Sequence, residues 1–360
     1  MVTTIRVALS ERSYDIEIGR GLLSTASEFV RRPVAPSRAI VITDSNVRSP
    51  HAERVAQSLA MGGIPVDLLS VPAGEASKSV AEAERLWNEL VRLKADRKSV
   101  VVAVGGGVVG DLAGFVAATF ARGLSFVQVP TTLLAQVDSS VGGKVGINLP
   151  AAKNIVGAFW QPAGVLIDLD VLATLPAREY RSGLAEVVKY GVILDASFFE
   201  YLENNVAALN ARQPAVLEQV VARSCRLKAD VVQQDEREVS GLRAVLNYGH
   251  TFCHAIETVT GYGQFLHGEA VAIGMVCASR LAVLLGRIDG SLTDRQAKLL
   301  AQLGLETSLP SLDHDALLAA MQHDKKTESG RLRFVLPARL GLVELVSGVD
   351  PLLVRQALHR

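Results

Sequence analysis

The 360-residue sequence has no surplus of charge of either sign. Lysine and arginine together number 37, aspartate and glutamate also number 37, and the formal net charge is zero. A protein that binds nucleic acid or an anionic membrane surface through its overall charge carries a basic excess. We therefore expect neither a nucleic-acid partner nor a membrane partner.

Cysteine is scarce, and long uninterrupted apolar runs are missing. The cysteines are Cys225, Cys253 and Cys277. Their odd number and wide spacing disfavour structural disulfides and favour a reducing compartment. The longest apolar stretch, Val100 to Ala121, is interrupted by Asp111 and by glycines, so we predict no transmembrane span. Residues 1–19 lack the basic-then-apolar pattern of a secretory signal, and we expect a cytoplasmic protein.

The sequence does contain enough apolar residues for a large core, because 49% of the chain is hydrophobic. In the first half, apolar β-rich runs alternate with helical patterns such as the stripe in residues 77–93. After an edge hairpin in residues 1–20, the predicted strands are 38–43, 66–71, 99–104 and 125–129. This alternation predicts a doubly wound parallel sheet that binds its ligand at the carboxyl ends of the strands.

Strand signals disappear after about residue 175. The predicted helices are 179–192, 214–232, 246–259, 269–285, 294–303 and 315–323, followed by a hairpin in 331–346 and a helix in 351–358. We therefore predict an α/β protein with two domains. Residues 1–175 form a Rossmann-like nucleotide-binding domain, and residues 176–360 form a mainly α-helical domain.

Three of the seven histidines lie between residues 246 and 275. His250 and His254 are four residues apart in a predicted helix, so their rings share one face. His267 follows a glycine-rich break and precedes the next helix. Two helices that meet at histidines can offer neutral imidazoles to zinc. On spacing alone, a capping or surface role for His267 is the alternative.

A glycine-rich turn follows the third predicted βα strand. Gly105, Gly107 and Gly110 satisfy GxGxxG between a strand and a helix, which lets the backbone approach a pyrophosphate at the helix N-terminus. The acid that usually follows about 20 residues later is missing. Asp44 and Glu75, at the ends of two earlier strands, are alternatives for binding a ribose, although Asp44 could instead cap the next helix. We predict a variant nucleotide site.

Residues 130–154 place polar side chains among glycines directly after the last predicted strand. They are Thr131, Thr132, Asp138, Lys144, Lys153 and Asn154. Two lysines and an asparagine at the carboxyl edge of the sheet suit an anionic group such as a phosphate. A plain surface loop is the alternative.

Together, and in this order, these stretches resemble the 3-dehydroquinate synthase family over nearly the whole chain, from VITDSNV to GRLRFVL. The most specific segments are PAGEASK, GGGVVGD, ARGLSFVQVPTTLLAQVDSSVGGKVGIN, KNIVGAFWQP, GLAEVVKYGVI, LNYGHTFCHAIE and LHGEAVAIGM. The resemblance implies a redox-neutral lyase of the shikimate pathway, which leads to chorismate and the aromatic amino acids. It would convert 3-deoxy-D-arabino-heptulosonate 7-phosphate to 3-dehydroquinate and phosphate by transient oxidation, elimination, reduction and aldol closure.

The resemblance also implies the site residues. Zinc or cobalt would be held by Glu186, His250 and His267, which moves His254 from the metal to the substrate phosphate. NAD would contact Asp44, Glu75, Lys78, Gly106, Gly107, Asp111, Thr131, Thr132, Asp138, Lys144, Lys153, Thr174 and Leu175. The substrate phosphate and hydroxyls would contact Lys144, Asn154, Lys189, Asn247 and His254. Its carboxylate would contact Lys228, Arg243 and a lysine of the pair Lys325–Lys326, of which we favour Lys326.

Two further points follow from the resemblance. Arg122 would reach the substrate from a neighbouring subunit, which implies a homodimer. The segment between Lys228 and Arg243 is one residue longer than the family pattern, and we place the extra residue in the turn at 238–241. The rival interpretations are a related sugar-phosphate cyclase, a metal-dependent alcohol or glycerol dehydrogenase, and a non-catalytic binding protein.

Overall fold

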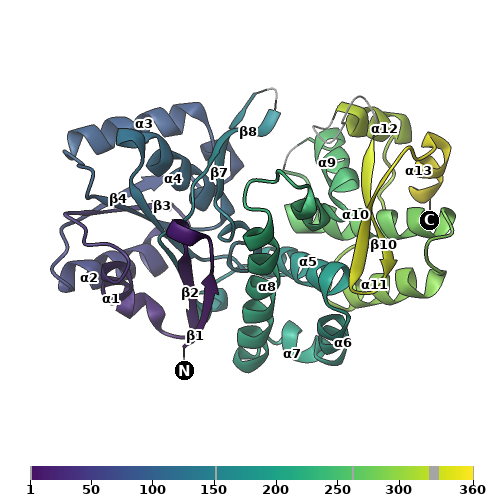
Figure 1. The fold of residues 1–360 in the computed structure, drawn as a ribbon, viewed down its shortest axis with the longest axis horizontal. Helices are drawn as coiled ribbons and strands as arrows, with labels where there is room; N and C mark the ends of the chain where they lie inside the picture. The colour runs from purple at the N-terminus through teal and green to yellow at the C-terminus, as the bar shows by residue number, and fades with distance from the viewer. Residues whose placement is uncertain (1, 151, 262, 324–331, 360) are drawn as a thin grey trace. The chain divides into compact units, whose positions relative to one another are not determined.

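A computed structural model describes residues 2–150, 152–261, 263–323 and 332–359 of the chain (Figure 1). Its internal contacts divide it into two compact units, which are described separately. The first unit combines Met1–Leu175 with Glu218–Arg237, and the second combines Pro176–Leu217 with Glu238–Arg360.

The first unit is an α/β structure in which strands and helices alternate. Its strands are β1 (Thr3–Val7), β2 (Tyr14–Gly19), β3 (Ala39–Asp44), β4 (Val66–Val71), β5 (Val100–Gly105), β6 (Ser125–Pro130), β7 (Lys144–Leu149), β8 (Ala152–Phe159) and β9 (Gly164–Asp168). Its helices are α1 (Ala26–Arg31), α2 (Glu53–Met61), α3 (Val80–Arg92) and α4 (Gly107–Thr119), together with most of α8 (Pro214–Gln234).

A seven-stranded sheet in the order β1-β2-β9-β6-β5-β3-β4 forms the centre of this unit. All neighbours pair in parallel except β1 and β2, which form the antiparallel edge hairpin. Because successive side chains point to opposite faces of a strand, each strand contributes to two cores. Val41 packs in a cluster with Val55 of α2, whereas Ile42 packs in a cluster with Leu86 of α3.

The second unit consists mainly of helices. They are α5 (Ala177–Leu194), α6 (Ala196–Asn204), α7 (Val206–Asn210), α9 (His250–Val259), α10 (His267–Leu284), α11 (Gly290–Gln302), α12 (His314–His323) and α13 (Pro351–Ala357). A two-stranded antiparallel sheet joins β10 (Arg333–Arg339) to β11 (Leu342–Ser347).

Helix α10 is the centre of the second unit and contacts α5, α9, α11, α13 and β10. In the described part of the chain it is the one helix long and apolar enough to cross a membrane. However, 72% of it is buried inside the protein. An apolar helix surrounded on all sides by its own fold is the core helix of a globular unit.

The predicted fold class and most of the predicted elements are confirmed. Strands β3 to β6 lie within one residue of the predicted ranges, and the edge hairpin and the late hairpin are present. The predicted elements do not include β7, β8, β9, α6 and α7. The hairpin of β7 and β8 begins in the stretch 130–154, where glycines and polar side chains obscure the alternation that marks a strand.

The predicted assignment of all residues 176–360 to one domain is wrong for Glu218–Arg237, because this part of α8 belongs to the first unit. The thiol of Cys225 donates to the carbonyl of Gln136, and Lys228 contacts Asp138. Helical periodicity in a sequence identifies an apolar stripe, but it does not identify the core against which that stripe packs.

Candidate functional site

Three helices of the second unit meet at a cluster of metal-binding side chains. Glu186 lies in the middle of α5, while His250 and His267 are the first residues of α9 and α10. Glycines allow the backbones of these helices to approach closely. A Cβ atom on Gly249 would lie 2.7 Å from the nitrogen of Met275, and one on Gly268 would lie 1.8 Å from the carbonyl of Ser182. The two histidines are therefore placed by close backbone contacts.

The geometry of this cluster suits a divalent metal. Oε1 of Glu186 lies 3.8 Å from Nε2 of His250 and 3.7 Å from Nε2 of His267. Ligand atoms about 2.1 Å from a tetrahedral ion are about 3.4 Å apart, close to these separations. One carboxylate and two imidazoles form a donor set typical of catalytic zinc.

Glu186 is a deeply buried carboxylate. Its side chain is 1% exposed, and neither oxygen accepts a hydrogen bond from the described residues. Lys189, one turn later on α5 and also buried, forms an ion pair with it. A buried polar atom without hydrogen bonds is costly unless a ligand satisfies it. The cluster therefore fits a bound cation.

His254 lies outside the metal cluster. Its ring centroid is 5.8 Å from that of His250, but it is in neither of the two groups of metal-capable side chains among the described residues. Spacing alone pointed to a metal site with an HxxxH pair. In the structure, side chains from α5 and α10 approach His250 instead, and they lie far from it in the sequence.

The second metal-capable group combines Cys253, Glu257 and His267. Nδ1 of His267 is 3.3 Å from Oε1 of Glu257 and 3.8 Å from the sulfur of Cys253. Burial lowers the pKa of His267, but Cys253 and Glu257 outweigh this effect and raise it. Burial raises the pKa of Cys253, and the neighbouring His267 opposes this effect. Glu257, which lies two helical turns after His250, is not among the site residues predicted from the sequence.

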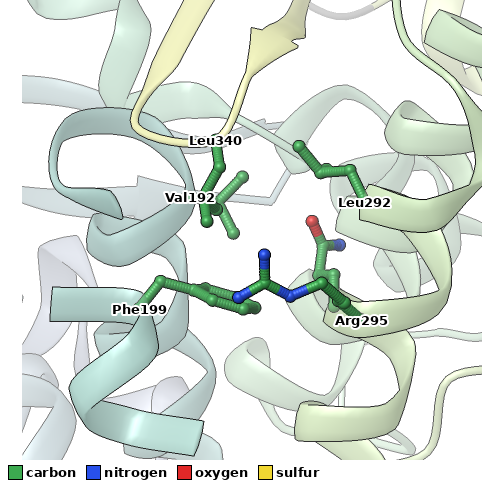
Figure 2. Close-up of a pocket in the computed structure, with 6 residues that line it drawn as sticks. Val192, Phe199, Leu292, Arg295 and Leu340 are labelled. Carbon is green, nitrogen blue, oxygen red and sulfur yellow. The ribbon is translucent and has the colours of Figure 1, made fainter. Parts of the chain in front are cut away.

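Tyr248 anchors the segment that leads into His250. Its carbonyl oxygen is 3.1 Å from Nδ1 of His250, and its hydroxyl is 2.8 Å from Oε1 of Gln296 and 3.0 Å from the carbonyl of Met275. Gln296 also lines a small cavity in which the guanidinium of Arg295 lies over the ring of Phe199 (Figure 2). Tyr248, two residues before His250, is thus fixed inside the core.

Two predicted substrate residues precede the cluster in the second unit. Arg243 and Asn247 lie in the 3-10 helix Leu242–Asn247. The side chain of Arg243 is 3% exposed, and its Nε lies 3.8 Å from a carboxylate oxygen of Glu238. This separation is longer than a hydrogen bond, so the contact is a loose ion pair. The carboxylate of Glu238, which the sequence analysis did not single out, already faces the predicted carboxylate-binding arginine.

The glycine-rich turn of the first unit has the expected shape. Strand β5 ends at Gly105 and α4 begins at Gly107. A Cβ atom on Gly105 would lie 2.6 Å from the side chain of Val109, so only glycine fits there. The nearby hydroxyl of Thr131 is buried and has no hydrogen-bond partner among the described residues. A narrow backbone turn, a helix N-terminus and an unsatisfied hydroxyl fit a bound pyrophosphate.

Lys78 joins two of the predicted NAD and substrate residues. Its ammonium is 2.5 Å from a carboxylate oxygen of Asp111 and 2.5 Å from Oδ1 of Asn154. Burial lowers the pKa of Lys78, but the carboxylates of Asp111 and Glu75 outweigh this effect and raise it. Lys78 is therefore a charged lysine with partners on two sides.

The remaining predicted residues of the first unit have these positions. Asp44 accepts hydrogen bonds from the backbone N–H groups of Asn46 and Val47 in a local turn, but the N-cap of the next helix is Val47, so Asp44 does not cap that helix. Glu75 accepts a hydrogen bond of 2.7 Å from Asn148. The hydroxyl of Thr174 is 2.8 Å from His51. Further positions are Lys144 at the start of β7, Lys153 in β8, and Gly106, Thr132 and Leu175 in connecting segments.

Three more predictions concern Lys228, Arg122 and the lysine pair. The ammonium of Lys228 donates to the carbonyl and a carboxylate oxygen of Asp138, at 2.7 and 2.8 Å. Arg122 is exposed and has a φ of 69°, a conformation that is uncommon outside glycine. Lys325 and Lys326 lie outside the described residues.

Comparisons with known proteins identify similar sequences over nearly the whole chain. Family models described as "3-dehydroquinate synthase N-terminal" and "3-dehydroquinate synthase C-terminal" match residues 68–182 and 183–327. A 3-dehydroquinate synthase of Rhodopirellula baltica is 51% identical over 354 residues, which cover 97% of this chain and 94% of the relative.

Solved structures of two related cyclases are similar over almost the whole chain. A 2-deoxy-scyllo-inosose synthase, crystallised with carbaglucose-6-phosphate, NAD+ and Co2+, has a TM-score of 0.90 and 28% identity and covers 99% of both chains. A 2-epi-5-epi-valiolone synthase of Streptomyces hygroscopicus, with NAD+ and Zn2+ bound, has a TM-score of 0.88 and 30% identity and covers 98% of this chain and 97% of its own.

Proposed function

The chain belongs to the 3-dehydroquinate synthase family, and we propose that it converts 3-deoxy-D-arabino-heptulosonate 7-phosphate to 3-dehydroquinate and inorganic phosphate. The observation that carries this proposal is the cluster of Glu186, His250 and His267. Its buried carboxylate accepts no hydrogen bond from the described residues and faces two imidazole nitrogens at 3.7 and 3.8 Å. The reaction would serve the shikimate pathway, which leads to chorismate and the aromatic amino acids.

Zinc or cobalt would bind Glu186, His250 and His267, and NAD would bind the glycine-rich turn of the first unit. When bound, the metal would lower the pKa of the ring hydroxyl as a Lewis acid, and NAD would accept and return the hydride of the carbon that bears this hydroxyl. Gly106 and Gly107 would leave room for the pyrophosphate at the start of α4. Either Glu75 or Asp44 would bind the ribose.

The further NAD contacts in this proposal come from residues around the same turn and strand ends. They are Lys78, Asp111, Thr131, Thr132, Asp138, Lys144, Lys153, Thr174 and Leu175. The unsatisfied hydroxyl of Thr131 supports this assignment, because a ligand would supply the hydrogen bond that it lacks.

The substrate would be held through its two anionic groups. Lys144, Asn154, Lys189 and His254 would contact the phosphate, and Asn247 would contact a hydroxyl. Arg243 and Lys228 would contact the carboxylate, with Lys326 as a third cation. Fixing both ends of the substrate holds the reacting hydroxyl in one orientation, which lowers the entropy cost of the reaction. The loose contact of Arg243 with Glu238 supports its role, because a bidentate carboxylate would bind more strongly.

We also propose a cytoplasmic homodimer with no nucleic-acid or membrane partner. The exposed Arg122 would act on the substrate bound to the partner subunit. Mixing Arg122→Ala with His267→Ala subunits tests this role, because a mixed dimer would contain one site with both residues intact. Recovery of activity on mixing is expected. No recovery under conditions of subunit exchange would contradict a role across the interface.

A second candidate function is the cyclisation of a sugar phosphate that has no carboxylate. The two solved cyclases favour it, since they match the fold at TM-scores of 0.90 and 0.88. Identity weighs against it, because they are 28% and 30% identical, whereas the 3-dehydroquinate synthase relative is 51% identical.

The test is phosphate release from the heptulosonate phosphate with NAD and zinc present, monitored together with NADH absorbance. Phosphate should appear without net NADH, because the hydride is returned in the same turnover. Steady accumulation of NADH would indicate a dehydrogenase. Phosphate release from heptulose 7-phosphate or glucose 6-phosphate alone would indicate the second candidate.

A further inference from the structure

We propose that Glu257 is a positioning residue for the metal ligand His267. This inference rests on the metal site of the proposed function. Oε1 of Glu257 lies 3.3 Å from Nδ1 of His267, and the side chain of Glu257 is 11% exposed. The nitrogen on the other side of the same ring, Nε2, lies 3.7 Å from Glu186. Each of the two ring nitrogens of His267 thus faces a carboxylate.

The hydrogen-bond chemistry of these groups fixes the state of the ring. An ionised carboxylate only accepts hydrogen bonds, so the nitrogen that faces Glu257 must carry the proton. In a neutral imidazole the other nitrogen then has a free lone pair. Glu257 therefore selects the tautomer in which Nε2 of His267 is the ligand atom directed at the metal. A hydrogen-bonded carboxylate also increases the basicity of the imidazole and strengthens its bond to a metal.

The other histidine of the cluster is held in the same way by the backbone. Nδ1 of His250 is 3.1 Å from the carbonyl oxygen of Tyr248, and its Nε2 faces Glu186. Each imidazole therefore has an oxygen acceptor behind it and the shared carboxylate in front. The difference is that a side chain supplies the acceptor for His267, so this acceptor can be removed by mutation.

Helix α9 provides one metal ligand, His250, and the group that orients the other. His250 is its first residue, and Glu257 follows seven residues, or about two turns, later. Residues seven apart lie on the same face of a helix, which here is the face next to the start of α10. The burial of Glu257 strengthens its hydrogen bond, because the local dielectric constant is low.

The alternative role of Glu257 is as a ligand to a second metal ion, together with Cys253 and His267. An ion at Nδ1 as well as one at Nε2 would require His267 to lose both of its ring protons. The single hydrogen bond from Nδ1 needs no such ionisation. The two roles differ in metal stoichiometry, which can be measured.

The experiment measures zinc affinity by competition with a chromophoric chelator, and metal content per chain, for the full chain and for Glu257→Gln and Glu257→Leu. Both substitutions should weaken zinc binding by about 10- to 100-fold while one ion still binds per chain. The absorption bands of bound Co2+ should shift, because the ring of His267 is less constrained. Glu344→Gln is the matched control, since Glu344 is an exposed carboxylate of the same unit paired with Arg287, and it should leave zinc affinity unchanged.

Thermal unfolding of the metal-free variants separates positioning from folding. Similar unfolding temperatures combined with weaker zinc binding support the proposal. The proposal is overturned if zinc affinity is unchanged in both Glu257 variants. It is also overturned if the substitutions lower the metal content from two ions per chain to one. His267→Ala distinguishes the failure of this inference from that of the proposed function. If the unmodified chain binds zinc through His267 but Glu257 has no effect, only the positioning role is wrong.

Discussion

In the first unit, Lys78 lies between Asp111 and Asn154 at 2.5 Å from each, whereas in the second unit the buried carboxylate of Glu186 accepts no hydrogen bond from the described residues. The first cluster pairs its own charges, which stabilises the fold, and the same three residues are proposed contacts of NAD and substrate. The second holds a buried carboxylate opposite two imidazoles, and a cation would complete it. In both clusters a lysine pairs with the carboxylate, Lys78 with Asp111 and Lys189 with Glu186. The second cluster differs because two imidazole nitrogens also face its carboxylate, which is the arrangement of a metal site.

The largest effect is expected from removing a ligand of the incomplete cluster. His267→Ala should abolish zinc binding and lower turnover by about 1000-fold or more, because a Lewis acid contributes several kcal/mol to such a reaction. NAD affinity should stay unchanged, since its proposed residues lie in the first unit. Metal analysis, steady-state rates and NAD titration would show this. Near-normal activity in metal-depleted buffer would disprove the metal assignment.

Removing Lys78 from its cluster should destabilise the metal-free protein more than His267→Ala does. Lys78→Met leaves Asp111 without its ammonium partner, and losing one member of a buried pair costs about 3 kcal/mol of unfolding free energy. Urea unfolding of the metal-free protein measures this cost. Lys98→Met, at an exposed position, is the control. Equal stability of Lys78→Met and the control would contradict the structural role of Lys78.

A smaller effect is expected from Arg243, a buried cation whose Nε lies 3.8 Å from a carboxylate oxygen of Glu238. Arg243→Lys should lower kcat/KM by about 10- to 100-fold, mainly through KM, because lysine cannot form the two parallel hydrogen bonds that arginine makes with a carboxylate. Stability should change little. Kinetics with the heptulosonate phosphate test this prediction. Unchanged kcat and KM would remove Arg243 from the carboxylate site.

The smallest effect is expected from the thiols, which belong to the cores of both units. Burial raises the pKa of Cys225 and of Cys277 to about 12. At pH 8 both therefore remain protonated in the folded protein, and they should react with a chromogenic disulfide reagent only on unfolding. Folding raises the pKa of both thiols, so the protonated thiols contribute fully to the free energy of unfolding below about pH 8.5. This contribution is lost as the pH rises toward 12. Rapid labelling of the folded protein would contradict it.

The metal cluster shows how far the sequence could be interpreted. The HxxxH spacing indicated a metal site but pointed to His254, and Glu186 entered only through the family resemblance. Glu186 is 64 residues before His250 in the chain, so no local pattern could connect them. Glu257 was missed for a different reason. A single glutamate on an amphipathic helix is common, and its role becomes visible only when the position of His267 is known.

The sequence by itself determined the alternation of strands and helices, the change to helices after residue 175, the glycine-rich turn and the family. These features depend on local periodicity and on contiguous motifs, which involve residues close together in the sequence. Only the tertiary structure decided that most of α8 belongs to the first unit, that Glu186 is the shared neighbour of His250 and His267, and that Glu257 lies behind His267. These depend on contacts between residues far apart in the chain, which the packing of whole helices brings together.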